Sequence, residues 1–73
     1  MKMTYKEKAN FMLYALTHDY FGYGTMVTKL KSGKYKIIVD GEKNYYTLHQ
    51  LAEDYDSLGI DEINDIKYVF NFE

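Results

Sequence analysis

A chain of 73 residues with a formal net charge of −2 has room for one domain, so we expect residues 1–73 to fold as a single unit. It contains no cysteine, which excludes disulfides and thiolate metal sites, and no apolar run approaches the roughly 20 residues that a membrane-spanning helix needs. The first residues are too charged for a secretory signal, so we expect a cytoplasmic protein without membrane contact.

The first predicted element is a helix that begins after Thr4. Thr4 and Glu7 have the spacing of a capping box, in which each side chain accepts a hydrogen bond from the other residue's backbone amide. Apolar residues then follow at helical spacing, namely Tyr5, Ala9, Met12, Leu13, Leu16 and Tyr20. Gly22 is expected to end the helix, because glycine takes the left-handed conformation after a helix without strain.

Three strands are predicted next, as an antiparallel meander. Residues 25–31 alternate between two faces, one of which carries Met26, Thr28 and Leu30. Ser32-Gly33 then has the composition of a two-residue hairpin turn. Residues 35–40 alternate in the same way, with one face made of Tyr35, Ile37 and Val39. Asp40-Gly41 is a second turn signal, after which residues 43–46 return as a short third strand.

A second helix and a final strand complete the prediction. Thr47 and Gln50 have capping-box spacing, and Gly59 is expected to end the helix that follows. Its apolar positions are Leu48, Leu51, Ala52, Tyr55 and Leu58. Residues 61–65 are interpreted as a loop or a single helical turn, and the alternation of residues 66–72 predicts a strand. The sequence therefore predicts an α+β fold of order α-β-β-β-α-β, with two helices on one face of a small antiparallel sheet.

Patterns typical of catalytic or metal sites are weak throughout the chain. Ser32 lies in a turn and Ser57 near a helix end, which are positions that serine favours for structural reasons. His49 and Glu53 share a helix face, but a catalytic zinc needs three protein ligands. The segment from Asp54 resembles the start of a calcium loop, yet a leucine takes one of the ligand positions. We therefore predict a protein that is not an enzyme and uses no metal or cofactor.

Two oppositely charged segments are the candidate binding sites. Residues 1–48 hold eight lysines and four acidic residues, a charge of +4, whereas residues 49–73 hold one lysine and seven acidic residues, a charge of −6. Such asymmetry concerns partners rather than the fold. The basic candidate flanks the first hairpin turn, close to several tyrosines, and comprises Lys29, Lys31, Lys34 and Lys36. The acidic candidate comprises Glu53, Asp54, Asp56, Asp61, Glu62 and Asp65.

Both segments also have a structural interpretation. Lysines on strands protect a sheet edge from aggregation, and acidic residues on a solvated face increase solubility. Carboxylates near the end of the predicted second helix oppose its dipole, however, which favours a binding role for them. All basic residues are lysines, and a sequence-specific DNA reader without arginine would be unusual.

The chain resembles the small early proteins of bacteriophages that infect low-GC Gram-positive bacteria. The resemblance lies in its length, its lysine-only basic set, its Tyr, Asn and Ile content, and acidic segments such as Glu53-Asp54-x-Asp56 and Asp61-Glu62. Several members of that group inhibit host machinery, some by resembling DNA, and sliding-clamp inhibitors and anti-CRISPR proteins are similar in scale. The resemblance implies an inhibitor that acts in host takeover, although the +4 half departs from uniformly acidic DNA mimics.

The leading prediction is a non-enzymatic inhibitor that docks the acidic residues on a basic, nucleic-acid-binding host protein. Such a protein would be, for example, a DNA replication or defence component whose DNA site is blocked. One alternative is a small nucleic-acid-binding module that uses the lysine hairpin. The other is a self-associating structural protein, for which the many tyrosines suit a homodimer interface.

Overall fold

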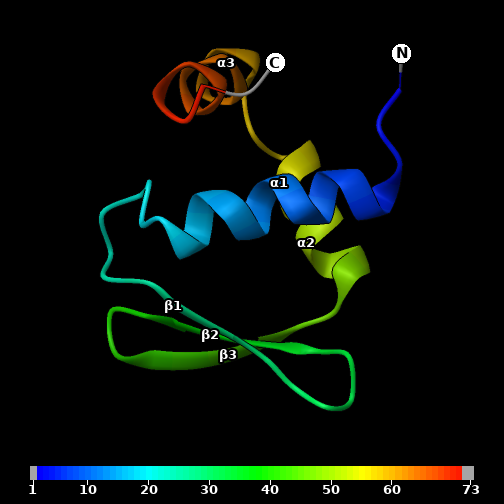
Figure 1. Cartoon of the computed structure of the whole chain (residues 1–73), viewed down its shortest axis with the longest axis vertical. Coiled ribbons are helices and arrows are strands. Elements are labelled where there is room, and N and C mark those ends of the chain that lie inside the picture. The colour runs from blue at the N-terminus through cyan, green and yellow to red at the C-terminus, as the bar shows by residue number, and fades with distance from the viewer. Residues whose placement is uncertain (1, 72–73) are drawn as a thin grey trace.

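The computed structural model describes residues 2–71. Its helices are α1 (Tyr5–Thr17), α2 (Leu48–Asp56) and α3 (Ile60–Val69), and its strands are β1 (Met26–Lys29), β2 (Tyr35–Val39) and β3 (Glu42–Tyr46). The antiparallel sheet has the order β1-β2-β3, α1 and α2 lie over one of its faces, and α3 lies on the far side of α1 (Figure 1). The α+β class and the antiparallel meander are therefore confirmed.

The last element is a helix, so the prediction of a strand at residues 66–72 is wrong for residues 66–71. Residue 72 lies outside the described part of the chain. The order is α-β-β-β-α-α. Ile60, Ile63, Ile66 and Phe70 are spaced by three, three and four residues, which is helical periodicity. Ile63 and Ile66 are buried against α1, so this pattern, rather than the alternation, decides the structure of the segment.

Residues near the start of α3 explain why the helix begins where it does. Gly59 does not end α2 in a left-handed conformation but is the N-cap of α3, with a φ of −72° and no side-chain cap. Asp61 and Glu62 lie in the first turn, where carboxylates interact favourably with the positive end of the helix dipole. Residues 61–65, interpreted above as a loop or a single turn, are the N-terminal half of a ten-residue helix.

Both predicted capping boxes are present. The N–H of Thr4 donates to Glu7 Oε1 (2.8 Å), and the N–H of Glu7 donates to Thr4 Oγ1 (3.2 Å). Thr47 and Gln50 repeat this arrangement at the start of α2, with the same two distances. Each box satisfies two backbone amides that have no partner within the helix, so α1 and α2 begin at the predicted residues.

The end of α1 differs from the prediction, because the helix stops before Gly22. Asp19 takes the left-handed conformation, with a φ of 54°. The N–H of Tyr20 donates to the carbonyl oxygen of Ala15 (2.9 Å), which closes the last turn. The Asp19 carboxylate also accepts a hydrogen bond from the N–H of Thr25 (3.1 Å), next to β1. One aspartate therefore ends α1 and fixes the start of the sheet.

The register of the sheet decides which side of β1 faces the helices. Val27 lies beside Ile37, which is fully buried under α1 and α2. Met26 is 63% exposed, so the face of β1 that carries Met26 is the outer face of the sheet. Val27 lies on the opposite face of β1 and packs on the core. The face of β2 that carries Tyr35, Ile37 and Val39 packs on the core.

The two hairpin turns use left-handed residues in different ways. Residues 30–34 connect β1 to β2. The N–H of Leu30 donates to the carbonyl oxygen of Lys34 (2.8 Å), which leaves a three-residue turn at 31–33 with Gly33 at a φ of 90°. The predicted two-residue turn there is therefore wrong by one residue. Asp40 and Gly41 form the two-residue turn expected between β2 and β3, with φ values of 52° and 84°.

Two faces of α1 are buried. The cluster on the sheet side consists of Ala9, Met12, Ile37 and Leu51. The cluster on the α3 side consists of Phe11, Ala15, Ile63 and Ile66. Helix α1 is therefore the central layer, and it separates α3 from the sheet (Figure 1). None of the helices within residues 2–71 is long and apolar enough to cross a membrane.

Candidate functional site

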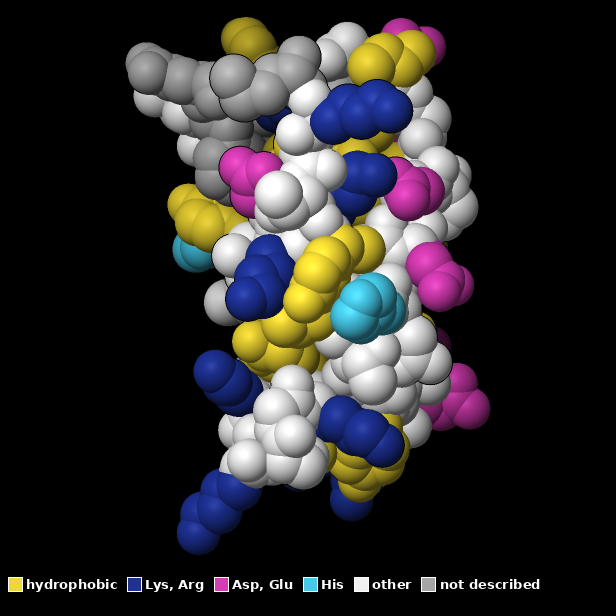
Figure 2. All heavy atoms as spheres, turned by 90° about the vertical axis from the view of Figure 1, so that its right-hand side faces the viewer, with side chains coloured by type: hydrophobic (Ala, Val, Ile, Leu, Met, Phe, Trp, Pro, Cys, Tyr) yellow, Lys and Arg dark blue, Asp and Glu magenta, His cyan; other side chains and the backbone are white. Residues whose placement is uncertain are grey.

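The six acidic residues predicted as a partner site lie on two consecutive helices, which we call the acidic helix pair. Helix α2 carries Glu53, Asp54 and Asp56. Helix α3 carries Asp61, Glu62 and Asp65. Asp54 and Glu62 are half-buried, and the other four side chains are exposed. In Figure 2, most acidic side chains in view lie along one edge of the molecule, and lysines are spread over the rest of this face from near its upper end to its lower end.

Two of these carboxylates have partners on or next to α1. Asp56 accepts a hydrogen bond from Lys8 Nζ (2.7 Å), and this is the one ion pair within residues 2–71. Asp65 accepts a hydrogen bond from the hydroxyl of Tyr20 (2.5 Å). Because Lys8 and Tyr20 are near opposite ends of α1, the acidic residues form an extended strip rather than one compact cluster. The exposed Lys8–Asp56 pair contributes at most about 1 kcal/mol to stability.

Asp54 is the acidic residue whose ionised form is least favoured. Burial raises the pKa of its carboxyl group, and the negative charge of the adjacent Glu53 raises it further. Because the pKa in the folded chain is above the unfolded value, the protonated form contributes stability at low pH, and this contribution is lost as the pH rises through the folded pKa. A positive group placed beside Glu53 and Asp54 would favour both ionised carboxylates.

The Tyr20–Asp65 hydrogen bond changes the titration of the tyrosine. It raises the pKa of Tyr20 from 10.0 to about 12, with smaller effects from desolvation and from the charges of Asp65 and Glu62. The stabilisation is therefore complete below about pH 10 and is lost as the pH rises through about 12. Asp65→Asn should return the pKa of Tyr20 towards 10, measured by an NMR titration of the tyrosine ring carbons.

Asp61→Asn is the matched control for this titration. It removes the same charge from the same helix, but Asp61 makes no hydrogen bond to Tyr20 and does not contribute to the shift in its pKa. The pKa of Tyr20 should therefore stay near 12 in Asp61→Asn. A value near 12 in Asp65→Asn as well would mean that this hydrogen bond is not the cause.

The four lysines predicted as a nucleic-acid site do not share one face. Lys29 pairs with Tyr35, whose side chain packs on the core, so Lys29 lies on the helix side of the sheet. Lys36 lies on the outer face, where Tyr45 is its neighbour across the strands. Lys31 and Lys34 are exposed in the loop between these strands. The hairpin therefore places its lysines on both sides of the sheet.

The two histidines lie against aromatic rings. His49 stacks on Tyr5, with the ring centroids 4.2 Å apart and the planes 14° apart. His18 lies 4.3 Å from Tyr14 and 5.5 Å from Phe70. Among residues 2–71 there is no group of three or more His, Cys, Asp or Glu side chains able to hold a metal ion. The His49–Glu53 pair and the segment from Asp54 accordingly gain no further ligands from the described part of the fold.

The sequence interpretation missed Lys8 and Tyr20, which contact the acidic helix pair. They are 48 and 45 positions from Asp56 and Asp65 along the chain, so no local spacing connects the partners. Only the packing of α2 and α3 against α1 brings them together.

Comparison with family models, curated proteins and solved structures finds no match to this chain.

Proposed function

We propose that the protein is a non-enzymatic inhibitor that docks the acidic helix pair on the basic surface of a nucleic-acid-binding protein and blocks its DNA site. A surface that binds phosphates is basic, and carboxylates can occupy it in their place. The resemblance to small phage proteins makes a host replication or defence protein the expected target.

The observation that carries the proposal is the separation of charges. The described residues include nine lysines and ten carboxylates, which is every acidic residue except Glu73, yet they form a single ion pair. Charges of opposite sign that neutralised one another would instead form several pairs. The separation leaves five of the six carboxylates of α2 and α3 without a cationic partner among residues 2–71, since only Asp56 is paired, and their spread along α1 suits an extended basic groove.

Asp54 gives further support. Its ionised form is disfavoured in the free protein by burial and by Glu53, and a basic partner would remove part of that disadvantage. By contrast, Asp61 and Glu62 already interact favourably with the start of α3, so they have a stabilising role in the free protein. We therefore expect Glu53 and Asp54 to contribute more to binding than Asp61 and Glu62.

The test is affinity capture of partners from a bacterial lysate, with identification by mass spectrometry. One variant replaces five carboxylates by amides: Glu53→Gln, Asp54→Asn, Asp56→Asn, Asp61→Asn and Glu62→Gln. We expect this variant to bind the captured protein at least about tenfold more weakly, because five charge contacts of a few tenths of a kcal/mol each add up to about 1.4 kcal/mol. The affinity of the unmodified protein should also fall with added salt.

The control changes four charges of the β1–β2 hairpin, outside the acidic helix pair, in the variant with Lys29→Gln, Lys31→Gln, Lys34→Gln and Lys36→Gln. It should capture the same partner as the unmodified protein. Circular dichroism checks that both variants fold, since loss of Asp61 and Glu62 removes about 0.3–1 kcal/mol each from α3. Equal capture by the amide variant and the unmodified protein would overturn the proposal.

A second candidate function is the binding of single-stranded nucleic acid on the outer face of the sheet. The observation that favours it is the pairing of Lys36 with Tyr45, which puts a cation beside a tyrosine that is 56% exposed. Amines and aromatic rings side by side suit a backbone phosphate and a stacked base. A gel-shift assay with single-stranded DNA and RNA at low salt distinguishes the two candidates, because an inhibitor that replaces DNA should bind neither.

A further inference from the structure

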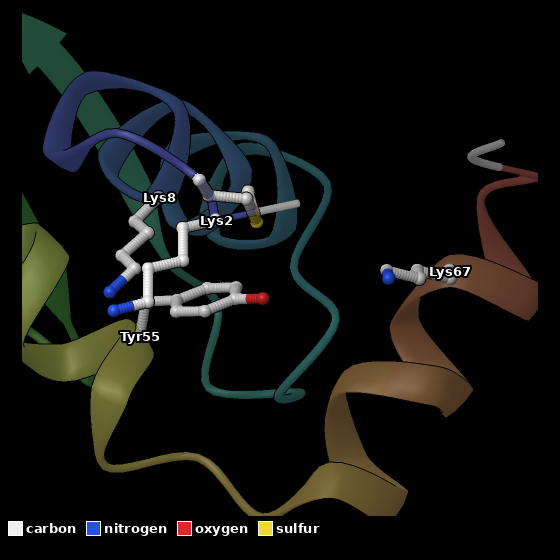
Figure 3. Close-up of a pocket in the computed structure, with 5 residues that line it drawn as sticks. Lys2, Lys8, Tyr55 and Lys67 are labelled. Carbon is white, nitrogen blue, oxygen red and sulfur yellow. The ribbon is translucent and has the colours of Figure 1, made fainter.

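A hollow of about 440 Å³ lies where the N-terminal segment, α1, α2 and α3 meet. Its lining consists of Lys2, Met3, Lys8, Tyr55 and Lys67. Figure 3 shows Lys2 and Lys8 beside Tyr55, with Lys67 extending from α3 on the other side of the hollow. The lining comes from three separate parts of the chain, residues 2–8, Tyr55 and Lys67, so the hollow exists only because α2 and α3 pack against α1.

The hollow is positively charged. Three of its five lining residues are lysines, and no carboxylate is among them. Within residues 2–71, Lys8 has an acidic partner in Asp56, at 2.7 Å, whereas Lys2 and Lys67 have none. Amines that face one hollow repel one another, and an anion between them would remove that repulsion. Lysine is a common ligand of phosphate groups, as a point charge with three donors.

The other part of the lining is apolar and aromatic. The ring of Tyr55 is half-buried and packs edge-on against Phe11, with the centroids 5.2 Å apart and the planes at 90°, which fixes its orientation. Met3 is also half-buried. In Figure 3 the hydroxyl of Tyr55 points from the ring towards the side of Lys67. A flat ring that packs on Tyr55 and Met3 would therefore sit beside the amines that hold a phosphate.

We propose that this hollow binds a small phosphate-bearing molecule with an aromatic ring, of which a mononucleotide is the simplest form. The amine of Lys67 holds the phosphate, Tyr55 and Met3 contact the ring, and the amines of Lys2 and Lys8 add positive potential from the other side of the hollow. The volume lies within the range of about 300–1,000 Å³ typical of small-molecule sites. This site lies between the helices of the acidic helix pair but uses none of their six carboxylates, so it does not depend on the proposed inhibitor function.

The first test is a titration with adenosine monophosphate, adenosine and inorganic phosphate at low ionic strength, followed by NMR. Adenosine monophosphate should shift the resonances of Tyr55 and Lys67 and bind at least about tenfold more tightly than inorganic phosphate, because stacking of a base contributes about 1–3 kcal/mol. Adenosine alone should bind more weakly than the nucleotide. Equal affinity for the nucleotide and inorganic phosphate, or no saturable binding, would overturn the proposal.

The second test uses matched lysine variants. Lys67→Gln should weaken nucleotide binding about fivefold, which is the effect of losing one partly exposed charge contact. Lys34→Gln makes the same change of charge at the hairpin tip, away from the hollow, and should leave the affinity unchanged. Both lysines are exposed, so neither change should disturb folding. An equal loss in the two variants would mean diffuse attraction to a basic surface and would overturn the site.

Asp56→Asn separates this site from the proposed inhibitor function. The change releases Lys8 from its carboxylate partner, so nucleotide binding should become tighter. The same change removes a charge from the acidic helix pair, so capture of a basic partner should become weaker. Opposite effects of one substitution in the two assays support both sites, and weaker nucleotide binding by Asp56→Asn would contradict the role given to Lys8.

Discussion

Leu51→Ala should lower the free energy of unfolding by about 2–5 kcal/mol. Leu51 has no exposed surface and packs in the cluster between the sheet and the helices, against Ala9, Met12 and Ile37. Truncation removes buried methyl groups and leaves a cavity that rigid neighbours on α1 and β2 fill only in part. A chain of this size has a total stability of roughly 4–11 kcal/mol, so the loss is a large share of it. Urea denaturation followed by circular dichroism measures the effect.

Met26→Ala is the control for this variant. Met26 lies on the outer face of β1 and is 63% exposed, so its truncation should change the free energy of unfolding by less than about 0.5 kcal/mol. If Leu51→Ala proved as mild as Met26→Ala, α2 would not pack on the sheet as described.

Ile66→Ala should cost about 2–5 kcal/mol and act mainly on α3. Ile66 has no exposed surface and packs with Phe11, Ala15 and Ile63, and this cluster holds α3 against α1. Its loss should speed hydrogen exchange at the amides of α3 more than at those of β2, because the sheet-side cluster is untouched. Urea denaturation and hydrogen exchange by NMR give the two measurements.

Val69→Ala provides the control and also distinguishes a helix from a strand. Val69 lies on the same helix and is 55% exposed. In a helix, alanine has a higher propensity than valine, so the change should be neutral or slightly stabilising. In a strand, the same change would be destabilising, because valine is the better strand former. A clear loss of stability in Val69→Ala would therefore contradict the helical assignment of α3.

The segment that forms α3 shows why part of the fold could not be predicted. Its residues fit two periods at once, since Ile66, Tyr68 and Phe70 alternate while Ile60, Ile63 and Ile66 follow helical spacing. Tertiary packing decides between a helix and a strand here, because Tyr68 is 86% exposed whereas Ile63 and Ile66 are covered by α1. The starts of α1 and α2 were predictable, because a capping box is a local interaction between residues three apart.

The candidate sites also have a part that the sequence predicts and a part that depends on tertiary packing. The charge asymmetry, and hence the acidic residues of α2 and α3, can be seen in the sequence. The interpretation that these residues oppose a helix dipole holds for α2 but not for Asp61 and Glu62, which lie at the start of a helix. The hollow between α1 and α3 has no signal in the sequence, because Lys2 and Lys67 line the same hollow only through the packing of the helices.

The position of α1 between two clusters also determines when the chain can complete its fold during synthesis. Helix α1 is made first, but Leu51 and Ile66, which cover its two faces, are added much later. At about 5–20 residues per second, Ile66 follows Thr17 after roughly 2–10 seconds. A helix of 13 residues is marginal in water by itself. Of the described elements, α1 leaves the ribosome first but is not fully covered until α3 has been made, and chaperones have that interval to bind it.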